Sequence, residues 1–121
     1  MDGIIVFAHG SRVESANEAV RIVARDLMRA SDCPRVIAAF LELGVPDMEG
    51  AADRLAAEGV DRIIVLPYFL TLGLHMERDL PVLVKRVEEK HPGVRVEVTA
   101  PLDGHPALTT ILLDRVRTAM G

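Results

Sequence analysis

The stretch DRIIVLPYFLTLGLHMERD, residues 61–79, begins as an apolar run and ends in a segment that carries glycine and histidine. An earlier stretch, GIIVFAHGSR at residues 3–12, has the same form. Short apolar runs rich in β-branched residues are typical of strands buried on both faces of a parallel sheet. We therefore expect two buried strands, each delivering a histidine, His9 or His75, at its carboxyl end.

The rest of the chain alternates between strand and helix patterns. Strands are predicted at residues 4–8, 35–43, 62–66 and 94–99, and helices at 16–30, 47–58, 79–90 and beyond the loop at 103–106. Ser15, Asp47 and Asp79 have the side chains and positions of helix N-caps. This alternation predicts an α/β fold with a small, open, mainly parallel four-stranded sheet and helices on both faces, flavodoxin-like in kind.

The natural strand order for such a sheet is 2-1-3-4. Ligands of open parallel sheets bind beyond the carboxyl ends of the strands, where the strand order reverses. With this order the reversal lies between the first and third strands. These are the strands that lead to His9 and His75, so both histidines are expected to face one cleft.

Composition narrows the possible functions. The 121 residues suffice for one domain, residues 1–121, with its own core. The formal net charge of −4 and the 3% aromatic content argue against nucleic acid or an anionic membrane as partner. Cys33 is the only cysteine, and no apolar run approaches the ~20 residues of a membrane span. We expect a soluble, cytoplasmic protein.

Two histidines on adjacent strand ends could serve three chemistries. Neutral imidazoles bind divalent iron, cobalt, nickel or zinc, and two of them leave an open coordination sphere suited to a metal that is handed on. Imidazole is also a general acid or base near neutral pH. Phosphoryl transfer to histidine is a third possibility, but Ala8 stands where the arginine of an RHG-type motif would be.

Three segments carry a resemblance to a known family. They are IIVFAHGSR at 4–12 followed by Asn17 and Glu18, FLEL at 40–43 followed by Pro46, and LPYFLTLGLHMERDLP at 66–81. Together they resemble the class II tetrapyrrole chelatases, specifically the short-form (small-type CbiX) sirohydrochlorin cobaltochelatases. The resemblance covers nearly the whole chain. It implies a single chelatase domain that dimerises, whereas longer relatives fuse two such domains.

The resemblance also implies roles for individual residues. His9 corresponds to a general base and metal ligand, and His75 to a second metal ligand. The family often has an acidic substrate contact at the position of Val45, where Glu42 is the nearest acidic residue. Ser11 and Arg12 are candidate donors to substrate carboxylates. The tetrapyrrole is expected to lie along the segment Leu70, Thr71, Leu72, Gly73, Leu74 and His75.

The function implied is insertion of a divalent metal into sirohydrochlorin, for cobalamin or a related modified tetrapyrrole. Co²⁺ is the first choice, with Fe²⁺ and Ni²⁺ as alternatives, and the metal is a substrate while no cofactor is permanently bound. The expected partners are the tetrapyrrole, the metal and a second copy in a homodimer. A non-catalytic metal or tetrapyrrole carrier is the rival hypothesis. A receiver-like signalling domain would need acidic residues where His9 stands.

Overall fold

The computed structural model describes the whole chain from Met1 to Gly121. Four strands alternate with four helices along the sequence. Their bounds are β1 (Asp2–Ala8), α1 (Glu14–Ser31), β2 (Val36–Phe40), α2 (Met48–Ala57), β3 (Arg62–Pro67), α3 (Leu74–Lys90), β4 (Arg95–Val98) and α4 (Pro106–Met120). No helix is both long enough and apolar enough to cross a membrane.

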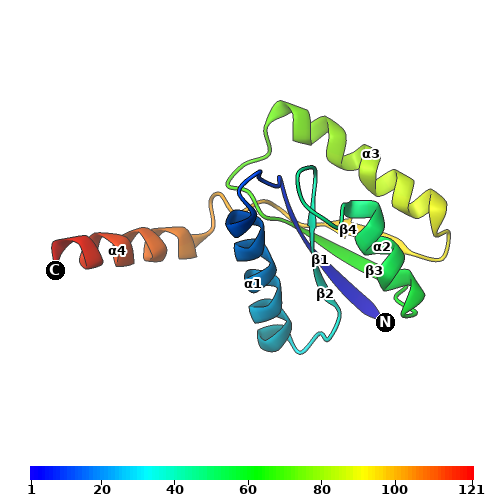
Figure 1. Cartoon of the computed structure of the whole chain (residues 1–121), viewed down its shortest axis with the longest axis horizontal. Coiled ribbons are helices and arrows are strands. Elements are labelled where there is room, and N and C mark those ends of the chain that lie inside the picture. The colour runs from blue at the N-terminus through cyan, green and yellow to red at the C-terminus, as the bar shows by residue number, and fades with distance from the viewer.

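The sheet confirms the predicted architecture. Its order is β2-β1-β3-β4, and all three strand pairs are parallel. The strand order therefore reverses between β1 and β3. These two strands form the centre of the sheet, and their carboxyl ends lie side by side (Figure 1).

Helices cover the sheet unequally. On one side, α2 and α3 enclose the larger core cluster, in which Phe7, Leu55 and Val65 are fully buried. On the other side, α1 packs mainly on β1 and β2 and encloses a smaller cluster around Val6 and Phe40. Burial on both faces explains why β1 is continuously apolar. β3 differs from the prediction: it is fully buried on one face only, and Ile64 and Leu66 on its other face are half-buried.

α4 is the exception to the layered arrangement. It extends away from the body as an arm (Figure 1), and none of its residues is buried. One side of this helix carries Leu108, Ile111, Leu112 and Val116, and this apolar face is largely uncovered. Leu112 is 65% exposed and Val116 is 49% exposed.

Three predicted boundaries were wrong. The second strand ends at Phe40, three residues before the predicted end. The first helix is capped by Val13, so Ser15 lies inside it and makes no cap. The third helix begins at Leu74 with Gly73 as its N-cap, so Asp79 is an interior residue. Asp47 does cap α2, since its carboxylate accepts a hydrogen bond from the Gly50 N–H at 2.8 Å.

An ionic contact joins the two helices on the better-covered side. Asp53 of α2 accepts from Lys90 Nζ at 2.9 Å and lies 2.7 Å from His91 Nε2 at the end of α3. Lys90 first, and then His91, hold the pKa of the Asp53 carboxyl below its ordinary value. His91 is half-buried in this contact, which the sequence did not predict.

Candidate active site

The backbone that follows β1 is held against the loop that follows β2. The Leu41 N–H donates to the Ala8 carbonyl at 2.9 Å, and the Glu42 N–H donates to the His9 carbonyl at 3.1 Å. These bonds continue the parallel ladder past the end of both strands. They fix the backbone of His9 at the carboxyl edge of the sheet.

Gly10 makes this close approach possible. Its φ is 92°, in the left-handed region, and a Cβ placed there would lie 1.7 Å from the Glu42 carbonyl oxygen. Any other residue would strain the backbone and push the two loops apart. The glycine after His9 therefore keeps the backbones of His9 and Glu42 in contact.

The His9 side chain is exposed and lies beside an aromatic pair. Its ring centroid is 5.2 Å from that of Phe69 in an edge-on arrangement, and Phe69 makes a similar contact with Phe7 at 6.2 Å. Such edge-on contacts are a preferred aromatic geometry. Neither ring nitrogen of His9 hydrogen-bonds to another protein group, so both remain open to a metal ion or a proton.

Asn17 is a buried residue that joins two loops of the candidate site, and the sequence predicted no role for it. It lies in the first turn of α1, is 1% exposed and is the only polar side chain in the buried set. Its Oδ1 accepts from the Ser11 N–H at 2.8 Å, and its Nδ2 donates to the carbonyls of Ser11 at 2.9 Å and Leu43 at 2.8 Å. One amide therefore ties the His9 loop to the Glu42 loop.

The signal for Asn17 was present in the sequence. An asparagine occupies the buried stripe of a helix, three residues before Val20, where an apolar residue is expected. A buried amide needs partners for its donors and its acceptor, and loop backbone supplies them. Arg21 and then Asn17 also lower the pKa of the Glu14 carboxyl at the start of the same helix.

His75 lies on the first turn of α3, whereas the sequence predicted a loop. Its side chain is exposed, and its Nδ1 lies 3.3 Å from a guanidinium nitrogen of Arg78. Arginine only donates, so this contact is a hydrogen bond when Nδ1 of His75 carries no proton. A metal ion that binds Nδ1 of His75 must displace Arg78 from this contact.

The segment 70–74 divides into exposed and inward residues. Leu70 is 63% exposed and Leu74 is 85% exposed, so both present apolar surface at this edge. Thr71 and Gly73 are also exposed, while Leu72 is half-buried and packs against the larger core. The apolar surface next to His75 is therefore present, and Leu70 and Leu74 supply it, while Leu72 points inward.

The two candidate substrate contacts near β2, Glu42 and Val45, have different surroundings. Glu42 is exposed and its backbone is bonded directly to His9. Val45 is 74% exposed, and its carbonyl accepts a hydrogen bond from Arg21 at 3.2 Å. The acidic side chain nearest to His9 along this loop is therefore Glu42.

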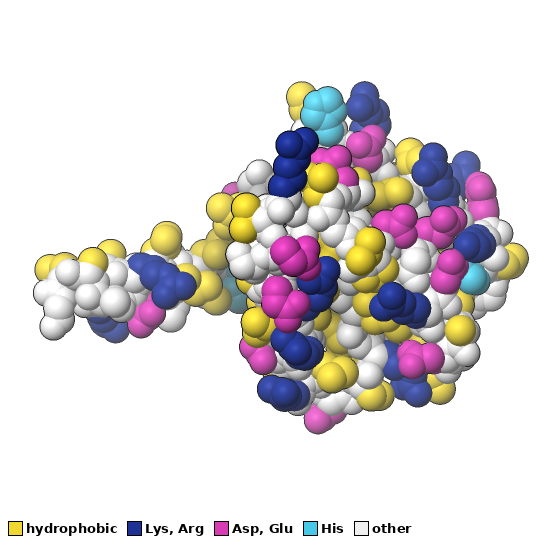
Figure 2. All heavy atoms as spheres, viewed as in Figure 1, with side chains coloured by type: hydrophobic (Ala, Val, Ile, Leu, Met, Phe, Trp, Pro, Cys, Tyr) yellow, Lys and Arg dark blue, Asp and Glu magenta, His cyan; other side chains and the backbone are white.

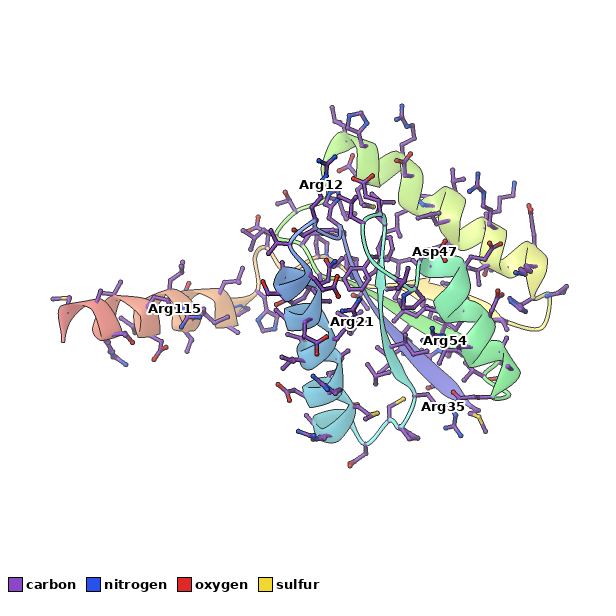
Figure 3. All side chains as sticks on the ribbon, viewed as in Figure 1. Arg12, Arg21, Arg35, Asp47, Arg54 and Arg115 are labelled. Atoms are coloured by element: carbon purple, nitrogen blue, oxygen red, sulfur yellow. The ribbon has the colours of Figure 1, made fainter.

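The Ser11 side chain is already hydrogen-bonded within the chain, whereas the Arg12 side chain is not. The Ser11 hydroxyl accepts from the Val13 N–H at 3.0 Å and so helps to shape the turn into α1. Arg12 is exposed and makes no ion pair or side-chain hydrogen bond within the chain. It lies at the end of the molecule where α3 starts (Figure 3), so its guanidinium is available to an anion.

No group of three or more His, Cys, Asp and Glu side chains is arranged to hold a metal ion. His105 is the N-cap of α4, and its Nδ1 accepts from the Ala107 N–H at 3.0 Å. A metal at this edge would thus have at most two histidine ligands from one chain. Such a partly filled coordination sphere suits transfer better than storage.

Comparison with known proteins identifies relatives across the whole chain. The CbiX family profile matches residues 3–119. The chain is 30% identical to a sirohydrochlorin cobaltochelatase of Methanopyrus kandleri, covering 100% of this chain and 99% of the relative. It is 31% identical to the chloroplastic sirohydrochlorin ferrochelatase of Arabidopsis thaliana, covering 96% of this chain and 52% of the relative. The chain therefore spans almost all of the first relative and about half of the second.

Solved structures agree on the fold. A putative cobalamin biosynthesis CbiX protein from Marinobacter aquaeolei superimposes with a TM-score of 0.86 at 28% identity, covering 99% of this chain and 98% of that one. SirB from Bacillus subtilis, solved with Fe³⁺, superimposes with a TM-score of 0.76 at 28% identity. There the match covers 83% of this chain but only 40% of SirB.

Proposed function

The chain belongs to the CbiX family, and from that membership we propose that it inserts a divalent metal ion into sirohydrochlorin. The observation that carries the proposal is His9. Its backbone is locked at the switch point of the sheet, its ring is steadied by Phe69, and both ring nitrogens are free. His75 follows the neighbouring strand β3 and supplies a second imidazole at the same edge.

The reaction requires two events that this edge can support. The metal ion must lose bound water, and the macrocycle must lose two pyrrole N–H protons as its four nitrogens bind the metal. His9 and His75 hold the incoming ion in place of water. When the ion passes to the macrocycle, the freed lone pair of His9 accepts a pyrrole proton and releases it to solvent. The exposure of His9 allows the second proton to leave by the same route.

The tetrapyrrole needs an apolar surface for its ring and donors for its carboxylates. Leu70 and Leu74 present exposed apolar side chains beside His75. Arg12 has an unpaired guanidinium at the same edge, and a planar guanidinium suits a carboxylate. We propose that the ring lies on the segment 70–74 and that Arg12 contacts a peripheral carboxylate.

Cobalt is the preferred metal in this proposal. The support is that the chain covers nearly all of an archaeal cobaltochelatase, whereas the ferrochelatase of Arabidopsis thaliana is about twice as long. Two imidazoles also accept iron and nickel, so the donor set alone does not select. We further propose a cytoplasmic location, which suits a chain whose one cysteine, Cys33, is free.

We also propose that two copies act together as a homodimer. One chain offers a single wall, the segment 70–74, to a macrocycle that has two faces. The exposed apolar side chains of α4 provide surface for such an association. A second copy would cover the outer face of the bound ring.

Timed absorbance spectra test the function. Purified protein is mixed with excess sirohydrochlorin and Co²⁺, with a protein-free sample measuring spontaneous insertion. An enzyme converts many equivalents per chain above that background, whereas a carrier stops at one. Parallel competition among Co²⁺, Fe²⁺ and Ni²⁺ then ranks the metals. Conversion that never exceeds one equivalent with any of the three would refute turnover.

A further inference from the structure

A positively charged side chain contacts the proposed metal ligand His75. A guanidinium nitrogen of Arg78 lies 3.3 Å from Nδ1 of His75, and Nε of the same side chain lies 3.5 Å from the Asp79 carboxylate. Residues three and four apart share one face of a helix, and these three residues lie on the first two turns of α3. In Figure 2, a histidine lies among basic side chains at the end of the molecule where α3 begins. The guanidinium of Arg78 therefore occupies one of the two ring nitrogens of His75.

This contact opposes the binding of a metal ion. The guanidinium of arginine is always charged in proteins. A metal ion that binds Nδ1 of His75 must displace Arg78, and a dication at Nε2 still meets the positive charge beside the ring. No cluster of three or more His, Cys, Asp and Glu side chains compensates for this charge. An arginine at this position does not help a chain to bind metal alone, so the contact must be relieved before the metal binds well.

The tetrapyrrole has the groups that would relieve it. Sirohydrochlorin is a polycarboxylate, and a carboxylate is a better partner for a guanidinium than an imidazole, because it accepts two parallel charge-assisted hydrogen bonds. The proposed wall for the ring ends at Leu74, which is 85% exposed and directly precedes His75. Arg78 lies one helical turn beyond Leu74, and its side chain is 73% exposed. Its ion pair with Asp79 is at the surface, where such pairs are weak, so the guanidinium can move to a carboxylate of the macrocycle.

We propose that Arg78 couples the binding of the two substrates. While the tetrapyrrole is absent, the guanidinium holds Nδ1 of His75. When the tetrapyrrole lies on residues 70–74, one of its carboxylates binds Arg78 and leaves His75 free for the metal ion. This role rests on the proposed function, and Arg78 fills it as a positioning residue that acts through His75.

Coupling of this kind is reciprocal. If the tetrapyrrole raises the affinity for the metal ion by some factor, the metal ion raises the affinity for the tetrapyrrole by the same factor. The chain then binds metal ions weakly until a macrocycle is present to receive them. Arg12, the other guanidinium proposed to contact a carboxylate, makes no side-chain hydrogen bond or ion pair within the chain. It therefore strengthens tetrapyrrole binding without changing the availability of His75.

Calorimetric titration with Co²⁺, in the presence and absence of a filled macrocycle, tests the coupling. The probe is copper uroporphyrin, which carries peripheral carboxylates and whose tightly held copper prevents Co²⁺ from entering the ring. Titration of the probe without protein measures the Co²⁺ that its own carboxylates bind. Without the probe, Arg78→Gln should bind Co²⁺ more tightly than the wild-type chain, and with the probe the two should bind it about equally. The probe should thus tighten Co²⁺ binding about fivefold more in the wild-type chain than in Arg78→Gln.

Two substitutions serve as matched controls. Arg86→Gln removes the same charge from the same helix, three turns away from His75, and should keep the wild-type response to the probe. Arg12→Gln should weaken binding of the probe, but at a saturating probe concentration it should also keep the wild-type tightening of Co²⁺ binding. Because the Arg78 side chain is exposed, Arg78→Gln should fold, and an unchanged circular dichroism spectrum checks this.

The outcomes separate the coupling from the proposed function. Equal tightening of Co²⁺ binding in the wild-type chain and in Arg78→Gln would overturn the coupling. A wild-type chain that binds the probe without any change in Co²⁺ affinity would overturn it as well. If neither chain binds the probe, the tetrapyrrole site of the proposed function is refuted, and the role of Arg78 with it. The titrations need no turnover, so the coupling is confirmed or overturned whatever rate of metal insertion is measured.

Discussion

Replacing Gly10 by alanine should destabilise the protein and disable the site, and Gly59 offers a matched control. Both glycines have a left-handed φ, 92° at Gly10 and 89° at Gly59. An added Cβ would lie 1.7 Å from the Glu42 carbonyl oxygen at Gly10, but it would meet only the Met1 sulfur, at 3.9 Å, at Gly59. Both substitutions therefore place an alanine at an unfavourable φ, but only the one at Gly10 also creates a steric clash.

The expected magnitudes follow from these contacts. A left-handed φ costs an alanine about 1–2 kcal/mol, which applies to both variants. At Gly10 the Glu42 loop must also retreat by more than about 1 Å, which breaks the bond from Glu42 N–H to the His9 carbonyl at a further cost of about 1 kcal/mol or more. Gly10→Ala should thus lose about 2–4 kcal/mol of unfolding free energy. A displacement of 1 Å at the catalytic group also costs up to about 100-fold in rate.

Urea denaturation and metal-insertion rates measure the two effects. The variant Gly59→Ala should show the smaller loss of stability and keep its insertion rate. Gly10→Ala should show the larger loss and a rate reduced by one to two orders of magnitude. Equal stability losses with equal rates would refute the role given to the close approach of the His9 and Glu42 backbones.

Three further predictions concern single side chains. Arg78→Gln should tighten Co²⁺ binding roughly fivefold in calorimetric titrations. A guanidinium repels a dication about 5 Å away by about 1 kcal/mol at physiological salt, and the substitution also frees His75 from its contact with Arg78. Asn17→Ala should lower the unfolding free energy by about 1–3 kcal/mol and reduce the insertion rate, because the Ser11 backbone loses its buried partners. Asp53→Asn should cost less than about 1 kcal/mol at pH 7, since this ion pair is exposed. The Asp53 pKa is lowered in the folded state, so its contribution is present above about pH 4 and is lost as the pH falls through the folded pKa.

Each of these predictions has its own control. Arg86→Gln, on the same helix as Arg78, should leave Co²⁺ affinity unchanged, and unchanged affinity in Arg78→Gln would contradict the competition for His75. An Asn17→Ala variant with wild-type stability and insertion rate would show that the loops do not need the hydrogen bonds of Asn17. For Asp53, urea unfolding at pH 7 and pH 3 is compared, and a stability difference that persists at pH 3 would contradict the assigned cause.

The sheet was predictable because its signals are local and strong. Continuous apolar runs marked β1 and β3 as buried strands, and the alternation with helices fixed a parallel sheet whose observed order is the predicted one. The cap at Asp47 was also predictable, because an aspartate side chain readily bonds nearby backbone N–H groups. In these places local preference and the global fold agree.

Element boundaries were less predictable because tertiary burial decided them. Asp79 and Pro81 have the residue types of a helix start, yet α3 begins five residues before Asp79. The earlier start lets Met76 and Leu80, both 3% exposed, pack into the larger core on one face of the helix. Burying these two side chains outweighs the local preference, and it moves His75 from a loop onto a helix.

The contacts of the candidate site were predictable only in part. The position of His9 after β1 follows from the strand pattern, whereas its bond to Glu42 depends on how two loops meet. The hydrogen bonds of Asn17 also depend on how these two loops come together. The exposed position of α4 was not predictable either, because an apolar stripe indicates that a helix is covered but not by which molecule.

The central claim is that His9 is the group that receives the metal and then the pyrrole proton. The most direct measurement compares the multiple-turnover rate of metal insertion in His9→Ala and in the wild-type chain, with His105→Asn as a histidine control that keeps the helix cap. We expect His9→Ala to fold, with an unchanged circular dichroism spectrum, and to insert metal no faster than the protein-free sample. A folded His9→Ala variant with wild-type turnover would contradict the account.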